Sequence, residues 1–194
     1  MADASSIKIL AFSGSSRKDS LNKRLLAVAV QAAREAGAAV TLADLRDYPM
    51  PIYDGDLEAA SGIPEHAKRF KDMMIEHHGF LIASPEYNSS FSPLLKNVID
   101  WASRPEPNQK PLVAFAGKVA GLLSASGGAM GGYRGLQQVR YVLGNIRTIV
   151  LPDMYALSGA DTAFGPDGTM TDPKKKDLAM NVGRDVVAKL VKLA

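Results

Sequence analysis

Side chains that suit an anion gather in one short segment near the start of the chain. An apolar run, residues 7–12, ends at residues 13–17 (SGSSR), and an apolar pattern of helical spacing begins at Leu21. The first turn of a helix offers free backbone N–H groups and a partial positive charge to an anion. The donor side chains of this segment are Ser15, Ser16, Arg17, Ser20 and Asn22. Because a guanidinium fits phosphate oxygens and the other groups add neutral donors, the segment predicts a phosphate-binding loop.

A plainer interpretation of the same residues is a turn followed by a capped helix. Ser20 would then only cap the helix, and Arg17 would be a solvated charge. The segment contains neither GxxxxGK[ST] nor G-x-G-x-x-G, which argues against a P-loop nucleotide site and the usual dinucleotide fingerprint. The chain has no cysteine, so thiol catalysis is excluded.

Two further loops follow apolar runs in the same way. Residues 80–83 lead into 85–88 (PEYN), where proline stiffens the turn and amides can pair with a flat polar heterocycle. Residues 119–125 lead into 126–132 (SGGAMGG), where nearly bare backbone allows a planar ring to approach closely. Together the three loops predict a phosphorylated planar ligand, which FMN fits best.

The elements that must position these loops alternate along the chain. The expected strands are residues 7–12, 40–45, 80–83, 119–125 and 148–151. The expected helices are residues 21–36, ended by Gly37; residues 64–78, ended by Gly79; a helix opened by Ser92-Pro93 and ended by Arg104-Pro105; one that carries Leu136 to Leu143; and residues 173–193. Residues 48–56 are too rich in proline to be helical and are expected to cover something.

This alternation, with strands that are apolar throughout, predicts an α/β fold with helices on both faces of a doubly wound, five-stranded parallel sheet. The expected order is 2-1-3-4-5 within a single domain, residues 1–194. Ligands bind such sheets at the carboxyl ends of the strands where the winding reverses, here between strands 1 and 3. The three loops follow strands 1, 3 and 4, so they should meet there.

Composition narrows the class of protein. A chain of 194 residues with a formal net charge of +3 and no long basic run predicts no nucleic-acid surface. No signal peptide or membrane span is expected, and the absence of cysteine agrees with a cytoplasmic protein. No metal site is expected, and His77 and His78 are interpreted as residues at a helix end. The single tryptophan, Trp101, is interpreted as packing or a subunit contact.

Three stretches also carry a family resemblance. They are residues 14–22 (GSSRKDSLN), residues 85–88 with the continuation 94–105 (LLKNVIDWASRP), and residues 124–132 (SASGGAMGG). With them the chain resembles the NADPH-dependent FMN reductase family of flavodoxin-like proteins, which includes bacterial quinone, azo-dye and chromate reductases. PEYN with its continuation is the most specific part. The strand-4 loop, on the nicotinamide-facing side, is richer in glycine than in many relatives.

The resemblance implies FMN as cofactor, NADPH or NADH as electron donor, and a small-molecule acceptor. It also implies a homodimer or homotetramer, with residues 49–56 bordering the neighbouring subunit's site. The implied cofactor-binding residues are Ser15, Arg17, Ser20, Leu21, Asn22, Pro85, Glu86, Tyr87, Asn88, Ser124, Ser126, Gly127 and Gly128.

Hydride transfer through a flavin needs no protein nucleophile or general base, so no catalytic side chain is expected. Glu86 is interpreted as structural rather than as an acid. Preference for NADPH would depend on a basic side chain such as Arg104 or Arg134. Two alternatives stay open: an FMN-binding electron carrier that does not oxidise nicotinamides, and a non-flavin interaction domain on the same fold.

Overall fold

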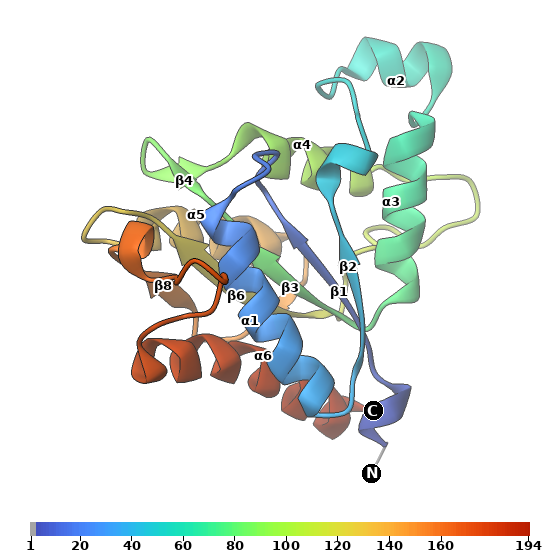
Figure 1. Ribbon diagram of the computed structural model, residues 1–194. Helices are drawn as coiled ribbons and strands as arrows, with labels where there is room; N and C mark the ends of the chain where they lie inside the picture. Colours follow the sequence, from blue (N-terminus) through green and yellow to red (C-terminus); the bar gives the residue numbers. More distant parts are fainter. Residues whose placement is uncertain (1–2) are drawn as a thin grey trace.

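The computed structural model describes residues 3–194, and its centre is a parallel sheet (Figure 1). The path through the sheet is β2-β1-β3-β6-β7, and every neighbouring pair on it is parallel. Its strands are β1 (Lys8–Ser13), β2 (Ala39–Ala43), β3 (Gly79–Ala83), β6 (Val119–Ala125) and β7 (Ile149–Val150). Since β6 and β7 are the predicted fourth and fifth strands, the predicted order 2-1-3-4-5 is confirmed. The structure of the chain is an α/β fold of the expected type.

The edge strand after β6 differs from the expectation because it is split in two. β7 pairs only with Val119 and Ala120, at the start of β6. Pro152, which has no N–H to donate to a ladder, follows soon after, and the chain leaves the sheet. It returns as β8 (Tyr155–Leu157), which pairs with the last three residues of β6. The return brings residues 158–162 to the carboxyl edge of the sheet.

Helices cover both faces, as predicted. They are α1 (Leu21–Glu35), α2 (Gly55–Ser61), α3 (Glu65–Glu76), α4 (Pro93–Ala102), α5 (Tyr133–Asn145) and α6 (Pro173–Leu193). Alternate residues of each strand pack against α1 and α6 on one face and against α3, α4 and α5 on the other. In β1, for example, Ile9 joins the first cluster and Leu10 the second. Within residues 3–194 no helix is both long enough and apolar enough to cross a bilayer.

Two helix boundaries differ from the sequence prediction. α2 was not expected; it begins after Asp54, whose side chain accepts from the Asp56 N–H, and ends at Ser61, with Gly62 at the C-cap in a positive-φ conformation (φ 73°). α3 ends at Glu76, so the prediction that Gly79 ends this helix is wrong. Gly79 opens β3, where a side chain would meet the Val119 carbonyl at 2.6 Å. Close packing between β3 and β6, not a helix stop, explains this glycine.

In the part of the chain that the structure describes, three short 3₁₀ turns complete the fold: η1 (Ala4–Ser6), η2 (Leu45–Asp47) and η3 (Ala160–Thr162). A small hairpin that was not predicted, β4 (Glu86–Tyr87) and β5 (Ser90–Phe91), lies between β3 and α4. Its turn residues Asn88 and Ser89 both have positive φ, 50° and 66°, as a type I′ turn requires.

Candidate functional site

The loops after β1, β3 and β6 meet at one pocket at the carboxyl edge of the sheet, as their positions in the sequence predicted. Its volume is about 220 Å³. The lining residues are Ser15, Arg17, Ser20, Leu21, Asn22, Pro85, Glu86, Tyr87, Ala125, Ser126, Gly127 and Asp161. Ten of the thirteen predicted cofactor residues are among them. The remaining three, Asn88, Ser124 and Gly128, do not line the pocket.

The loop after β1 presents hydroxyl donors and a free cation. Ser20 is the N-cap of α1, and its Oγ accepts from the Lys23 N–H at 3.4 Å. Ser15 Oγ accepts from the Arg17 N–H, also at 3.4 Å. Each hydroxyl keeps its own proton for a ligand. The exposed Arg17 forms no salt bridge within residues 3–194. The capping role and the anion-binding role of this loop are therefore compatible.

Asn22 joins this loop to the loop after β6. Its Nδ2 donates to the Ala125 carbonyl at 3.0 Å, and its Oδ1 accepts from the Ala125 N–H at 3.0 Å. Both halves of the buried amide are thus bound to backbone. Asn22 lines the pocket, but the structure gives its side chain a positioning role between two loops.

Glu86 joins the loop after β3 to the start of α5. Its Oε1 accepts from Arg134 Nε at 3.1 Å and lies 3.0 Å from Arg134 Nη2, and its Oε2 accepts from the Gly135 N–H at 2.9 Å. The N-terminal end of a helix favours a carboxylate. A side chain on Gly135 would press on the Glu86 backbone, which lies 3.3 Å from that position. These contacts are those of a structural carboxylate.

The predicted residues Asn88, Ser124 and Gly128 adjoin pocket residues in the sequence but do not line the pocket. Asn88 is in the hairpin turn, next to Tyr87, which is 49% exposed. Ser124 is fully buried, and its Oγ has no partner within residues 3–194. It lies under Gly132, where any side chain would collide with the hydroxyl. Gly132 (φ 90°) therefore allows the turn that starts α5 to lie directly on the end of β6.

The segment over residues 50–53 is fixed by α4. Asn97 accepts from the Tyr53 N–H at 2.8 Å and donates to the Pro51 carbonyl at 2.8 Å. The buried Trp101 donates from Nε1 to the same carbonyl at 2.8 Å, and its ring meets Tyr53 edge-on. Trp101 is therefore a packing residue, as expected. Ile52, between these anchored residues, is 85% exposed.

Sequence reasoning missed two residues of the pocket, Ala125 and Asp161. Ala125 contributes mainly backbone to the Asn22 contact, so its side chain carried no signal. Asp161 lies 34 residues after Gly127 in the sequence, in η3, and reaches the pocket only because β8 pairs with the end of β6. No short-range pattern could have connected it to the glycine-rich loop.

The pocket's chemistry fits FMN. The phosphate can be bound by a free guanidinium, two hydroxyls and a helix N-terminus. At Gly127 a side chain would collide with the Asp161 carboxylate, so that stretch of the wall must be bare backbone. Pro85 and Tyr87 also line the pocket. The hydrogen-bond donors thus suit the phosphate of FMN, and the wall of bare backbone suits its flat ring system.

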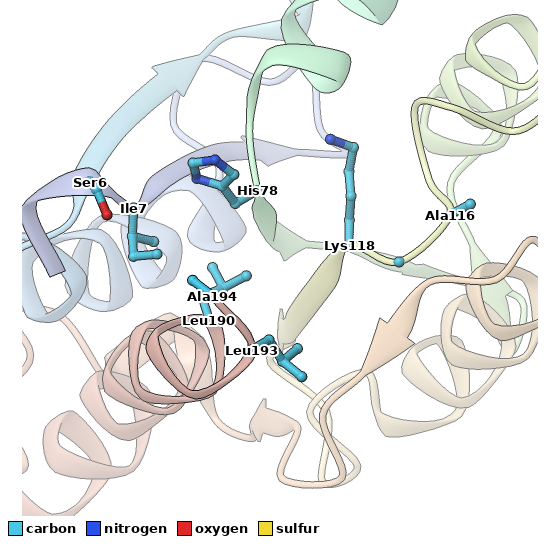
Figure 2. Close-up of a pocket in the computed structure, with 9 residues that line it drawn as sticks. Ser6, Ile7, His78, Ala116, Lys118, Leu190, Leu193 and Ala194 are labelled. Atoms are coloured by element: carbon cyan, nitrogen blue, oxygen red, sulfur yellow. The ribbon is translucent and has the colours of Figure 1, made fainter. Parts of the chain in front are cut away.

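A larger cavity, of about 420 Å³, lies at the opposite, amino-terminal edge of the sheet (Figure 2). Its polar groups are already bound to backbone: His78 Nδ1 accepts from the Lys8 N–H at 2.9 Å, and Lys118 Nζ donates to the carbonyls of Ile75 and His77. Burial lowers the pKa of Lys118 to about 8. Burial, followed by the nearby positive charge of Lys118, lowers the pKa of His78. The larger volume of this cavity alone does not make it the better candidate for the functional site.

Known proteins resemble this chain in sequence and in fold. A family model described as NADPH-dependent FMN reductase matches residues 7–162. An NAD(P)H-dependent FMN reductase of Pseudomonas aeruginosa is 36% identical over 179 residues, 89% of each chain. An NAD(P)H:quinone oxidoreductase of Solanum tuberosum is 35% identical over 91% of this chain and 89% of its own. Among solved structures, a flavoenzyme NAD(P)H:acceptor oxidoreductase of Paracoccus denitrificans superposes with a TM-score of 0.80, at 29% identity over 96% of this chain and 98% of its own.

Proposed function

The chain belongs to the NADPH-dependent FMN reductase family, and from this premise we propose that it oxidises NAD(P)H at an FMN held by the three-loop pocket and reduces a quinone-type acceptor there. The observation that carries the proposal is the meeting of Arg17, the α1 N-terminus and the bare Gly127 backbone in one pocket. Bound FMN would supply the hydride and electron transfer, which amino-acid side chains cannot.

The chain's own residues bind and orient. Arg17, Ser15 and Ser20 hold the phosphate with donors that exist before the ligand arrives. Asn22 fixes the distance between the phosphate loop and the loop after β6, because both ends of its amide are bound to Ala125. Glu86 fixes the wall after β3 against α5. No side chain is assigned as an acid, base or nucleophile.

The purified protein tests the proposal directly. We expect bound or reconstitutable flavin, visible as yellow absorbance, and oxidation of NADPH or NADH that accelerates on addition of benzoquinone or ferricyanide. Protein that binds FMN but does not oxidise either nicotinamide would be an electron carrier. Colourless protein that cannot be reconstituted with FMN would favour an interaction domain.

The acceptor is proposed to be a quinone, with azo dyes and chromate as further candidates. Support comes from relatives that are named quinone oxidoreductases or quinone reductases. Steady-state kcat/KM values for a quinone, an azo dye and chromate at fixed NADPH would rank the three. A higher value for chromate than for every quinone tested would contradict this part of the proposal.

We further propose that Arg134, not Arg104, favours NADPH over NADH. Both arginines are paired with a carboxylate, but Arg104 donates to Glu58 at 2.9 Å and its guanidinium lies 5.3 Å from the centre of the Tyr53 ring, and neither of these partners lines the pocket. Arg134 is 58% exposed and contacts the pocket residue Glu86. Because Arg134→Ala also removes the contact with Glu86, the rates are measured at saturating FMN, where the variant should raise the KM for NADPH about tenfold and leave that for NADH unchanged. Arg104→Ala is the control, and equal effects on both nicotinamides would reject the assignment.

A homodimer or homotetramer is also proposed. One chain's pocket, at about 220 Å³, is smaller than most sites for ligands of this size, and the exposed Ile52 is held in place by the contacts of α4 with Pro51 and Tyr53. Both features suit a site completed by a second subunit. Sedimentation of the wild type and of Ile52→Asp, with Leu178→Asp as a matched exposed control, tests this. A wild type that is a monomer at micromolar concentration would contradict it.

A further inference from the structure

Asp161 is held against the glycine-rich loop by the backbone. The Ser126 N–H donates to the Leu157 carbonyl at 3.1 Å, and the Ala160 N–H donates to the Ser126 carbonyl at 3.1 Å. These two bonds place η3 beside residues 126–128. The Asp161 carboxylate then fills the space over the Gly127 Cα where a side chain would otherwise lie. Asp161 is therefore part of the pocket wall, although its own side chain is exposed to solvent.

The pocket is rich in donors and poor in free acceptors. Ser15, Ser20 and Ser126 each accept a backbone N–H, so their remaining capacity is chiefly as O–H donors. The side-chain oxygens of Asn22 and Glu86 are already bound to Ala125, Arg134 and Gly135. Within residues 3–194, Asp161 is the pocket carboxylate whose two oxygens have no hydrogen-bond or salt-bridge partner.

A carboxylate in this position needs a ligand group that donates a hydrogen bond. The phosphate of FMN only accepts and is negatively charged, so it would repel Asp161 across a pocket this small. The donors of FMN are the hydroxyls of its ribityl chain and one ring N–H. Gly127 lies two residues after Ala125, which Asn22 binds to the first turn of α1, at the phosphate end of the pocket. The part of FMN that follows the phosphate is the ribityl chain.

We propose that Asp161 accepts a hydrogen bond from a ribityl hydroxyl and thereby selects flavins with an intact polyol chain. This inference rests on the proposed function, because it takes FMN to be the ligand of the pocket. It adds a recognition element that comes from the segment after β8.

Three flavins separate the possible roles of Asp161, with binding measured by quenching of flavin fluorescence on titration with apo-protein. Riboflavin has the ribityl chain without the phosphate, and lumiflavin has neither. Asp161→Ala should raise the Kd of riboflavin about three- to tenfold, as for a charge-assisted bond at an exposed group, and leave that of lumiflavin unchanged. The Kd of FMN should rise by the same factor or by less, because the phosphate also loses a repulsive charge. Asp161→Asn, which keeps an uncharged acceptor, should raise both by less.

Asp153→Ala removes an exposed carboxylate outside the pocket and controls for net charge. An unchanged riboflavin Kd in Asp161→Ala would overturn the inference. So would an equal loss for lumiflavin, which would assign Asp161 to the ring N–H, or tighter FMN binding with riboflavin unchanged, which would make it a repulsive group. Failure of the wild type to bind FMN would instead refute the proposed function itself.

Discussion

The carboxylate of Glu86 and the guanidinium of Arg134 lie 3.0 Å apart, and this pair connects the loop after β3 to the first turn of α5. Glu86 is 11% exposed and also accepts from the Gly135 N–H, so it is held from two sides. One wall of the pocket is therefore fixed to α5 by a partly buried, charge-assisted contact. Such a contact positions a ligand without taking part in chemistry.

Glu86→Gln should weaken FMN binding about three- to tenfold and leave kcat of the FMN-saturated protein within about twofold. The amide keeps a neutral acceptor for Gly135 but loses the ion pair with Arg134. FMN titration of apo-protein and steady-state rates at saturating FMN measure the two effects. Glu65→Gln, on an exposed first turn of α3, is the control. A large loss of kcat with an unchanged Kd would show that Glu86 acts as an acid.

Arg17→Ala should weaken FMN binding about ten- to a hundredfold, because an arginine–phosphate bond is charge-assisted and Arg17 forms no salt bridge among the described residues. The same variant should bind riboflavin, which lacks the phosphate, as the wild type does. Lys18→Ala, which removes the neighbouring exposed charge, controls for net charge. Equal losses for FMN and riboflavin would place Arg17 elsewhere than at the phosphate.

The pKa of Lys118 predicts a rise in stability at alkaline pH. Burial lowers its pKa to about 8 in the folded protein, whereas an unfolded lysine titrates near 10.4. Between these values the unfolded chain binds a proton that the folded protein has released, so the free energy of unfolding increases with pH across that window. Because Lys118 is only partly buried, so that solvent screens its charge, and also donates to two carbonyls, we expect a rise of about 1–2 kcal/mol rather than the full linkage value.

Urea unfolding of the wild type and of Lys118→Met at pH 7.5, 9 and 10 tests this. The variant should lack the increase. Lys192→Met, at an exposed position of α6, should keep it. Parallel pH profiles for wild type and Lys118→Met would mean that this lysine titrates normally in the folded protein.

Two helical glycines should respond to alanine with opposite signs. Gly183 of α6 lies so close to α1 that a Cβ would collide with the Ala29 carbonyl, whereas Gly144 of α5 has open space around it. Helix propensity favours alanine by about 1 kcal/mol at either position. At Gly183 the collision is with rigid backbone, so overpacking of about 1–3 kcal/mol exceeds that gain.

We therefore expect Gly183→Ala to lower the free energy of unfolding and Gly144→Ala to raise it slightly, as measured by chemical denaturation. The paired variants control for the intrinsic preference for alanine. Stabilisation by both would show that α1 and α6 can separate at little cost.

The sequence alone determined the layered architecture and the place of the site. Apolar runs such as residues 80–83 and the helical spacing of residues 21–36 are local signals, because a buried strand and an amphipathic helix each show a characteristic period. The rule that parallel strands present their carboxyl ends at one edge then brought Arg17, Tyr87 and Gly127 together without coordinates.

Only the tertiary structure decided how the side chains at that edge are used. Glu86 meets Arg134, and Asn22 meets Ala125, across 48 and 103 positions of sequence respectively. Asp161 enters the pocket because the edge strand is interrupted near Pro152 and returns as β8. Contacts between residues so far apart depend on strand pairing and packing, which leave no periodic pattern in the sequence. The sequence therefore cannot distinguish a polar residue that faces a ligand from one that is bound to a neighbouring loop.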